Sequence, residues 1–105
     1  MIKFKDLNSF KHSISGNHWL VLFPNGYGLS IIDGDIFYTS NEAPYEVALI
    51  SHDLKLEEPL NPLSEDYDYQ VVYNNDFNDV KGFQTENKID KLIDKVFNYE
   101  SKLNG

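Results

Sequence analysis

The sequence predicts an α+β fold: an antiparallel sheet of four to five strands, beginning with an N-terminal meander, and two helices packed on the sheet. Three observations support this fold. Residues 18–39 contain three strand-like runs separated by two turn signals. Residues 85–103 have the apolar spacing of an amphipathic helix. The run 18–23 is apolar on both faces, which is typical of a central strand covered on both sides.

The N-terminal half divides into short elements. Leu7, Phe10 and Ile14 form one apolar stripe, which predicts a short helix before Gly16 ends it. The Pro-Asn-Gly sequence at 24–26 and the Asp-Gly pair after Ile32 are typical of hairpin turns. We therefore expect a helix over 5–15 and strands over 18–23, 27–32, 36–39 and 45–51.

The second half has a long irregular segment between two regular elements. Residues 52–66 contain two prolines and many charges, so we expect no regular structure there. Alternating apolar residues over 67–73 predict a fifth strand. The closing helix, over 85–103, has Thr85 as its expected N-cap.

Length and composition limit the class of protein. The 105 residues fit a single domain, residues 1–105, without an internal repeat or a linker. The chain has no cysteine, which excludes disulfides and thiolate metal sites. It also has no signal-like N-terminal stretch and no apolar run of about 20 residues. We expect a soluble protein of the cytoplasm with no membrane partner.

The negative charge is concentrated in one part of the chain. The formal net charge is −8, and residues 53–79 carry eight acidic side chains against one lysine, Lys55. The chain contains no arginine, the side chain best suited to bidentate contacts with phosphate and guanine. We therefore expect no direct binding to nucleic acid. A protein with a basic surface, in contrast, would be attracted by the negative charge.

The densest acidic cluster, 65–69, alternates with tyrosines. Its carboxylates, about 5–7 Å apart, could imitate DNA phosphates, and the tyrosines could anchor a protein interface. A solubilising surface would show the same composition, so both interpretations stay open. The residues predicted to bind a partner are Glu57, Glu58, Glu65, Asp66, Tyr67, Asp68, Tyr69, Asp76 and Asp79.

No motif predicts catalysis. His12, His18 and His52 are scattered, without the spacing of a metal site. Ser30 lacks the second glycine of a nucleophile elbow, so strand packing is its expected role. No glycine-rich phosphate loop is present. We expect no catalytic residue, no metal and no cofactor, and a protein that is not an enzyme.

Two segments resemble a known family. The run from Trp19 to Ile32 contains Phe-Pro-Asn-Gly-Tyr-Gly, and a Tyr-Glu-Val-Ala sequence begins at Tyr45. Both resemble a family of small uncharacterised proteins of tailed bacteriophages, and 78–97 is loosely similar to the family too. The resemblance implies a phage origin and supplies no catalytic residues.

Charge and resemblance together predict a non-enzymatic phage accessory protein that binds and modulates a host protein with a basic surface. An anti-defence inhibitor with an acidic, DNA-mimic-like face would act this way in the host cytoplasm. The alternative is a structural or self-associating virion or assembly module, in which an open sheet edge forms a homodimer.

Overall fold

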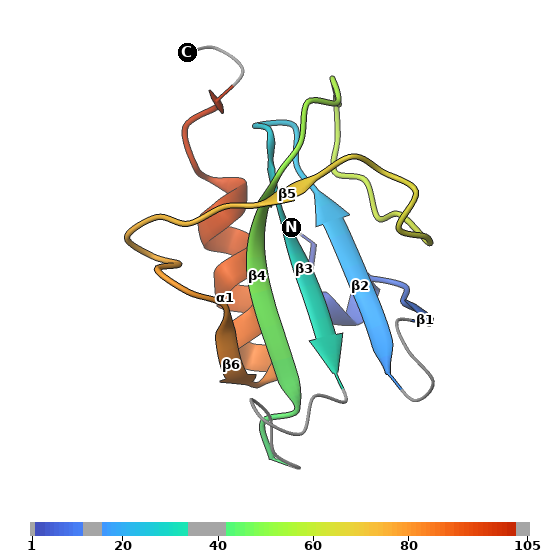
Figure 1. Cartoon of the computed structure of the whole chain (residues 1–105), viewed down its shortest axis with the longest axis vertical. Coiled ribbons are helices and arrows are strands. Elements are labelled where there is room, and N and C mark those ends of the chain that lie inside the picture. The colour runs from blue at the N-terminus through green and yellow to red at the C-terminus, as the bar shows by residue number, and fades with distance from the viewer. Residues whose placement is uncertain (1, 12–15, 34–41, 103–105) are drawn as a thin grey trace.

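The computed structural model describes residues 2–11, 16–33 and 42–102. It has the predicted α+β architecture: an antiparallel sheet with one helix packed on it (Figure 1). The elements in chain order are the 3-10 turn η1 (Phe4–Asp6), β1 (Phe10–Lys11), β2 (Asn17–Leu22), β3 (Tyr27–Asp33), β4 (Tyr45–Ser51), β5 (Gln70–Val71), β6 (Lys81–Gln84) and the helix α1 (Glu86–Phe97).

The sheet is built around three long strands. Its order is β1-β2-β3-β4-β5, and every pairing is antiparallel. The short strands β5 and β6 share the outer edge of β4: β5 pairs near Ile50, and β6 pairs near Tyr45. On the opposite edge, Leu60 exchanges two backbone hydrogen bonds with Leu22 and continues the line of β1. Short segments therefore protect both edges of the sheet.

The inner face of the sheet packs against α1. Ile89, Ile93 and Val96 follow the helical repeat, and all three are fully buried. Thr85 caps the helix as predicted, since its Oγ1 accepts from the Lys88 N–H at 3.3 Å. The remaining buried members of this core are Phe4, Leu7, Val21, Phe23, Leu29, Ile31, Val47, Leu49 and Phe77.

The outer face is covered by the chain between β4 and β5, together with Phe10 of β1, instead of by a helix. Leu20, Leu22 and Ile50 form a second buried cluster there. The side chains that cover it are Phe10, Leu56, Leu60, Tyr67 and Tyr69. β2 is thus buried on both faces, as its two-sided apolar pattern predicts.

Three predicted elements differ from the structure. The predicted helix over 5–15 is absent from its described part, residues 5–11, where a 3-10 turn is followed by β1; residues 12–15 lie outside the described residues. The reason is that Leu7 joins the inner core while Phe10 packs on the outer cluster. The strand over 67–73 shrinks to β5, and α1 ends at Phe97 instead of residue 103. The strand predicted over 36–39 lies outside the described residues.

β6 is a strand that the sequence did not predict. Its segment contains Lys81, Gly82 and a phenylalanine in the left-handed region, Phe83, with φ +54°. The register slips between the Tyr45 and Val47 pairings, so Phe83 lies in a bulge. This segment forms a strand because it pairs with the free edge of β4. That edge exists only once the whole sheet has assembled.

The predicted turn at 24–26 holds the end of α1, because the Asn25 side chain donates to the Val96 carbonyl oxygen. Gly26 has φ +89°, a conformation that favours glycine. A Cβ on Gly28 would lie 2.3 Å from the Val21 carbonyl oxygen, so only glycine fits there. Because Lys102 N also donates to the Asn25 carbonyl, the turn holds the chain beyond the helix as well. The Phe-Pro-Asn-Gly-Tyr-Gly sequence therefore has a structural role.

Candidate functional site

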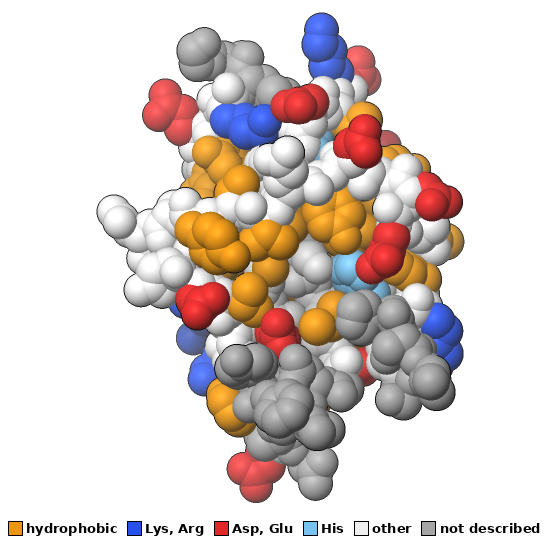
Figure 2. Space-filling view, viewed as in Figure 1, with side chains coloured by type: hydrophobic (Ala, Val, Ile, Leu, Met, Phe, Trp, Pro, Cys, Tyr) orange, Lys and Arg blue, Asp and Glu red, His pale blue; other side chains and the backbone are white. Residues whose placement is uncertain are grey.

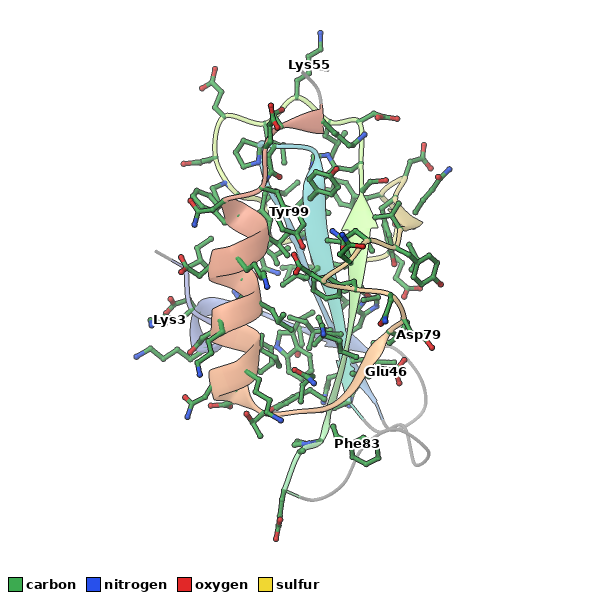
Figure 3. The ribbon with its side chains drawn as sticks, turned by 90° about the vertical axis from the view of Figure 1, so that its left-hand side faces the viewer. Lys3, Glu46, Lys55, Asp79, Phe83 and Tyr99 are labelled. Atoms are coloured by element: carbon green, nitrogen blue, oxygen red, sulfur yellow. The ribbon has the colours of Figure 1, made fainter. Side chains whose placement is uncertain are left out.

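The predicted partner-binding residues lie in three places on the chain that leads from β4 to β6. Figure 3 views the layers edge-on, with Lys3 on the helix side and Asp79 on the opposite side of the sheet. The acidic residues therefore do not form the single face expected from the sequence. Instead, the chain wraps around the sheet and distributes their carboxylates over both sides.

The first place is on the helix side. Glu58 and Pro59 line a groove of about 680 Å³ together with Ile93 and Phe97 of α1. Glu57 precedes them in the chain and is exposed. This position separates both glutamates from the cluster at 65–69, although the sequence places them only a few residues away.

The second place is the outer face of the sheet. Tyr67 and Tyr69 pack their rings against the outer cluster, while Asp66 and Asp68 are exposed between and beside them. Burial, followed by the nearby Glu65 carboxylate, raises the pKa of the Tyr69 phenol. Because successive side chains point in opposite directions, the two tyrosines pack on the sheet and the two aspartates point into solvent.

Two exposed apolar side chains extend this surface. Val71 is 45% exposed and Tyr73 is 62% exposed, whereas most of the large apolar residues are buried. We call residues 65–73 the acid–tyrosine segment. Figure 2 shows the side of the molecule away from α1, where separate carboxylates surround apolar patches. Carboxylates at a rim and aromatics near the centre are typical of a protein interface.

The third place is the chain between β5 and β6, where Asp76 lies beside the end of α1. Asp76 accepts a hydrogen bond from the Tyr99 hydroxyl at 2.7 Å and pairs with Lys95 Nζ at 3.0 Å. The Tyr99 bond, followed by the Lys95 bond, lowers the pKa of the Asp76 carboxyl. Asp79 is exposed, and its Oδ1 accepts from the Val80 N–H. Asp76 therefore helps to hold the helix, which makes it a poor recognition group.

A serine, a histidine and a glutamate meet on the outer face, which the sequence did not predict. His18 is 3% exposed, and its Nδ1 lies 2.8 Å from Glu65 Oε1. Its Nε2 lies 2.7 Å from Ser30 Oγ. Phe10 covers the imidazole at 4.8 Å between ring centroids. The pairing of the two predicted strands would have been enough to predict that Ser30 lies near His18. Nothing in the sequence indicates that the irregular segment after β4 brings Glu65 to these two residues.

These three groups have the order of a hydrolytic triad but not its setting. Ser30 lies in the middle of β3, where Leu20 and Ala48 pair with it on either side. Such triads need free N–H groups that point at an oxyanion, and a strand paired on both sides commits its N–H groups to the sheet. The arrangement is better suited to fix the acid–tyrosine segment to β2 through Glu65.

A polar hollow of about 450 Å³ lies between the end of β4 and β5. His52 lines it together with Asp53, Asp68 and Lys102. His52 Nε2 donates to the Phe23 carbonyl oxygen at 2.8 Å, and Nδ1 accepts from the Leu54 N–H. Lys102 pairs with Asp53 at 3.0 Å. With both ring nitrogens of His52 engaged, the imidazole is a structural group that ties the loop to the turn.

Two further findings concern the described part of the chain. It holds no group of three or more histidine, aspartate or glutamate side chains arranged to bind a metal ion. Across residues 2–11, 16–33 and 42–102, no helix has the length and apolar character needed to cross a membrane. Comparison of the chain with protein-family models, curated proteins and solved structures finds no match.

Proposed function

We propose that this protein is a non-enzymatic phage accessory protein that binds a host protein with a basic surface in the host cytoplasm. The observation that supports this function best is the acid–tyrosine segment. There, the exposed Asp66 and Asp68 flank tyrosines that are packed against the sheet. The sequence has no lysine or arginine between Lys55 and Lys81, so no cation within this stretch offsets the carboxylates.

The segment is also held in place before a partner arrives. Tyr67 and Tyr69 pack on the outer cluster, Glu65 bonds to His18, and β5 pairs with β4. A surface that is already ordered loses less conformational entropy on binding than a free loop. Exposed carboxylates accelerate the approach of a cationic partner, and aromatic side chains supply contact area.

An anti-defence role follows from the same surface. A host nuclease or transcription factor that binds DNA presents a basic surface, and the exposed carboxylates of Asp66 and Asp68 would compete with phosphate for it. Such an inhibitor acts by occupying the surface and needs no reaction of its own. The phage resemblance of the hairpin and of the β4 sequence supports this class of role.

The test separates charge on this segment from total charge. Asp66→Asn with Asp68→Asn removes two carboxylates, and Glu57→Gln with Asp79→Asn removes two elsewhere; Glu65 is retained because it bonds to His18. For a host protein captured from lysate and then purified, we expect the first variant to weaken binding about two- to thirtyfold at low salt. The loss should shrink at high salt. Equal losses in both variants, or no loss in either, would reject the proposal.

Self-association is a second candidate, supported by apolar groups on the β4 side of the sheet. Val71, Tyr73 and Phe83 are 45%, 62% and 51% exposed, and all three belong to or adjoin the strands on this edge. A homodimer across this edge would cover them. Sedimentation at several concentrations should then show a dimer that Tyr73→Ser weakens. A monomer at every concentration, together with absence of the protein from virions, would contradict an assembly role.

A further inference from the structure

We infer that the groove beside α1 binds a lysine side chain presented by the partner. This inference rests on the proposed function, because it names the chemistry of the cationic group that the host protein would present. The groove has a volume of about 680 Å³ and lies between η1, the C-terminal half of α1 and the chain after β4. It is separate from the acid–tyrosine segment, so a partner would engage it as a second contact.

The floor of the groove is apolar. Phe23 and Ile93 are fully buried, and Phe97, which is 36% exposed, lies edge-to-face against Phe23 at 5.5 Å between ring centroids. Ile2 and Pro59, each partly buried, complete the apolar lining. The apolar surface still open to water belongs to Phe97, Ile2 and Pro59, and an aliphatic chain laid on these three side chains would remove it from water.

Two carboxylates lie at the rim, and they come from distant parts of the chain. Asp6 belongs to η1 and Glu58 to the segment after β4, and both are exposed. Asp6 uses Oδ2 to accept from the Lys3 N–H at 3.0 Å. No lysine is among the described residues that line the groove. A cation would therefore find two negative groups above an apolar floor, whereas an anion would be repelled.

This combination selects a lysine side chain. Lysine carries a four-carbon stem that packs along apolar surface while its ammonium group stays at the solvent edge. This compact group can turn its donors to two carboxylates on separate segments, whereas the planar fork of arginine matches a single carboxylate. The stem would lie on Phe97 and Pro59 above the buried Phe23, and the ammonium group would approach Asp6 and Glu58. A neutral apolar side chain would gain only from the floor, and a phosphate-bearing ligand would gain nothing from the rim.

Titration of the full chain with short peptides tests the inference. The probe is a capped peptide of alternating leucine and lysine, compared with peptides in which methionine, glutamate or arginine replaces lysine. Amide chemical shifts should move at Phe23, Ile93 and Phe97, and the lysine peptide should bind more tightly than the methionine peptide. The glutamate peptide should not bind. Equal affinity for lysine and methionine, tighter binding of arginine, or shifts confined to other residues would overturn the inference.

Variants show which groups make the selection. Asp6→Asn or Glu58→Gln should each weaken the lysine peptide about two- to fivefold and leave the methionine peptide unchanged. Glu57→Gln, with the same loss of charge at an exposed neighbour, is the matched control and should have no effect. Phe97→Leu should weaken both peptides together. If Glu57→Gln equals Glu58→Gln in effect, long-range charge explains the binding and the groove assignment fails.

The same experiment separates this inference from the proposed function. Peptide binding in the groove should be nearly unchanged by Asp66→Asn with Asp68→Asn, because neither aspartate lines the groove. If that variant loses the host partner while no peptide enters the groove, the groove inference alone is wrong. If peptides bind in the groove but the variant keeps the partner at every salt concentration, the acid–tyrosine segment is the part that fails.

Discussion

The Asn25 side chain donates from Nδ2 to the Val96 carbonyl oxygen at 2.8 Å, although 71 residues separate the two in the sequence. The same amide group lies 3.3 Å from the Phe97 carbonyl oxygen and 3.2 Å from that of Tyr99. Its Oδ1 accepts from the Tyr27 N–H. One asparagine thus shapes the β2–β3 turn and satisfies carbonyl groups that the end of α1 leaves free.

Replacing this asparagine should destabilise the whole fold. Asn25→Ala removes the donor and leaves the last carbonyl groups of α1 to solvent, so we expect the free energy of unfolding to fall by about 1–2 kcal/mol. Urea denaturation measures the change. Asn75→Ala is the control, since Asn75 is exposed in another turn, and should change it little. Equal effects of the two substitutions would contradict a helix-capping role.

Phe83 combines a left-handed backbone with an exposed ring. For a residue with a Cβ, a φ of +54° destabilises the folded state by about 1–2 kcal/mol. Because the ring is 51% exposed, burial of its apolar surface offsets only part of this backbone strain. Figure 3 shows the Phe83 side chain at the lower end of the sheet, on the side away from α1. We expect Phe83→Asn to raise the free energy of unfolding by about 0.5–1 kcal/mol, because asparagine tolerates this conformation.

The control for Phe83 is another exposed aromatic residue without positive φ. Tyr73 is 62% exposed, and Phe83 is the sole non-glycine residue with positive φ in the described part of the chain. Tyr73→Asn should therefore give no gain in thermal or urea stability. If both substitutions raise stability equally, loss of an exposed apolar side chain, and not relief of backbone strain, is the cause.

Asp76 should make stability depend on pH in the acid range. Hydrogen bonds from Tyr99 and Lys95 lower the pKa of this carboxyl in the folded state below its ordinary value of 3.8. The ionised Asp76 carboxylate therefore makes its full contribution to the free energy of unfolding at pH values above its ordinary pKa. This contribution is lost as the pH falls from the ordinary pKa through the lowered pKa of the folded state.

The measurement is the urea midpoint across the acid range for the native chain and for Asp76→Asn. The variant keeps an oxygen that can accept from Tyr99, so it should fold while losing this part of the pH dependence. Asp79→Asn serves as the control. Parallel pH profiles of the native chain and Asp76→Asn would show that other carboxyl groups cause the loss in acid.

The bond between His18 and Glu65 should control how tightly the acid–tyrosine segment is held. Glu65→Ala removes a hydrogen bond to a buried imidazole, so we expect local opening of residues 61–69 to become about tenfold more frequent. Amide hydrogen exchange measures this opening. Glu57→Ala should leave exchange at 61–69 unchanged, and an equal increase in both variants would contradict the role of the bond.

Ser30, His18 and Glu65 should not act as the catalytic triad of a hydrolase. Ser30→Ala should lower stability through the lost contact with His18, while the native chain should not react with a fluorophosphonate probe at Ser30. The physical reason is that the β3 backbone is paired on both sides and offers no oxyanion site. Labelling of Ser30 that depends on His18 would contradict this and would indicate an enzyme.

The sequence by itself determined the elements whose signals are local. The apolar alternation of β2 and β4, the Pro24-Asn25-Gly26 turn and the Thr85 cap act within a few residues, so pattern and turn chemistry predict them. The tertiary structure decided the rest. Phe10 joined the outer cluster instead of a helix, and β6 formed against an edge that only the assembled β4 supplies.

The distribution of the acidic residues also required the tertiary structure. In the sequence, Glu58 and Glu65 are close neighbours in one charged stretch, but in the fold Glu58 lines a groove beside α1 and Glu65 bonds to His18 on the outer face. The reason is that Leu60 pairs with Leu22 along the edge of the sheet, which directs the chain from one side to the other. Composition fixes the amount of charge, whereas the path of the backbone fixes where it lies.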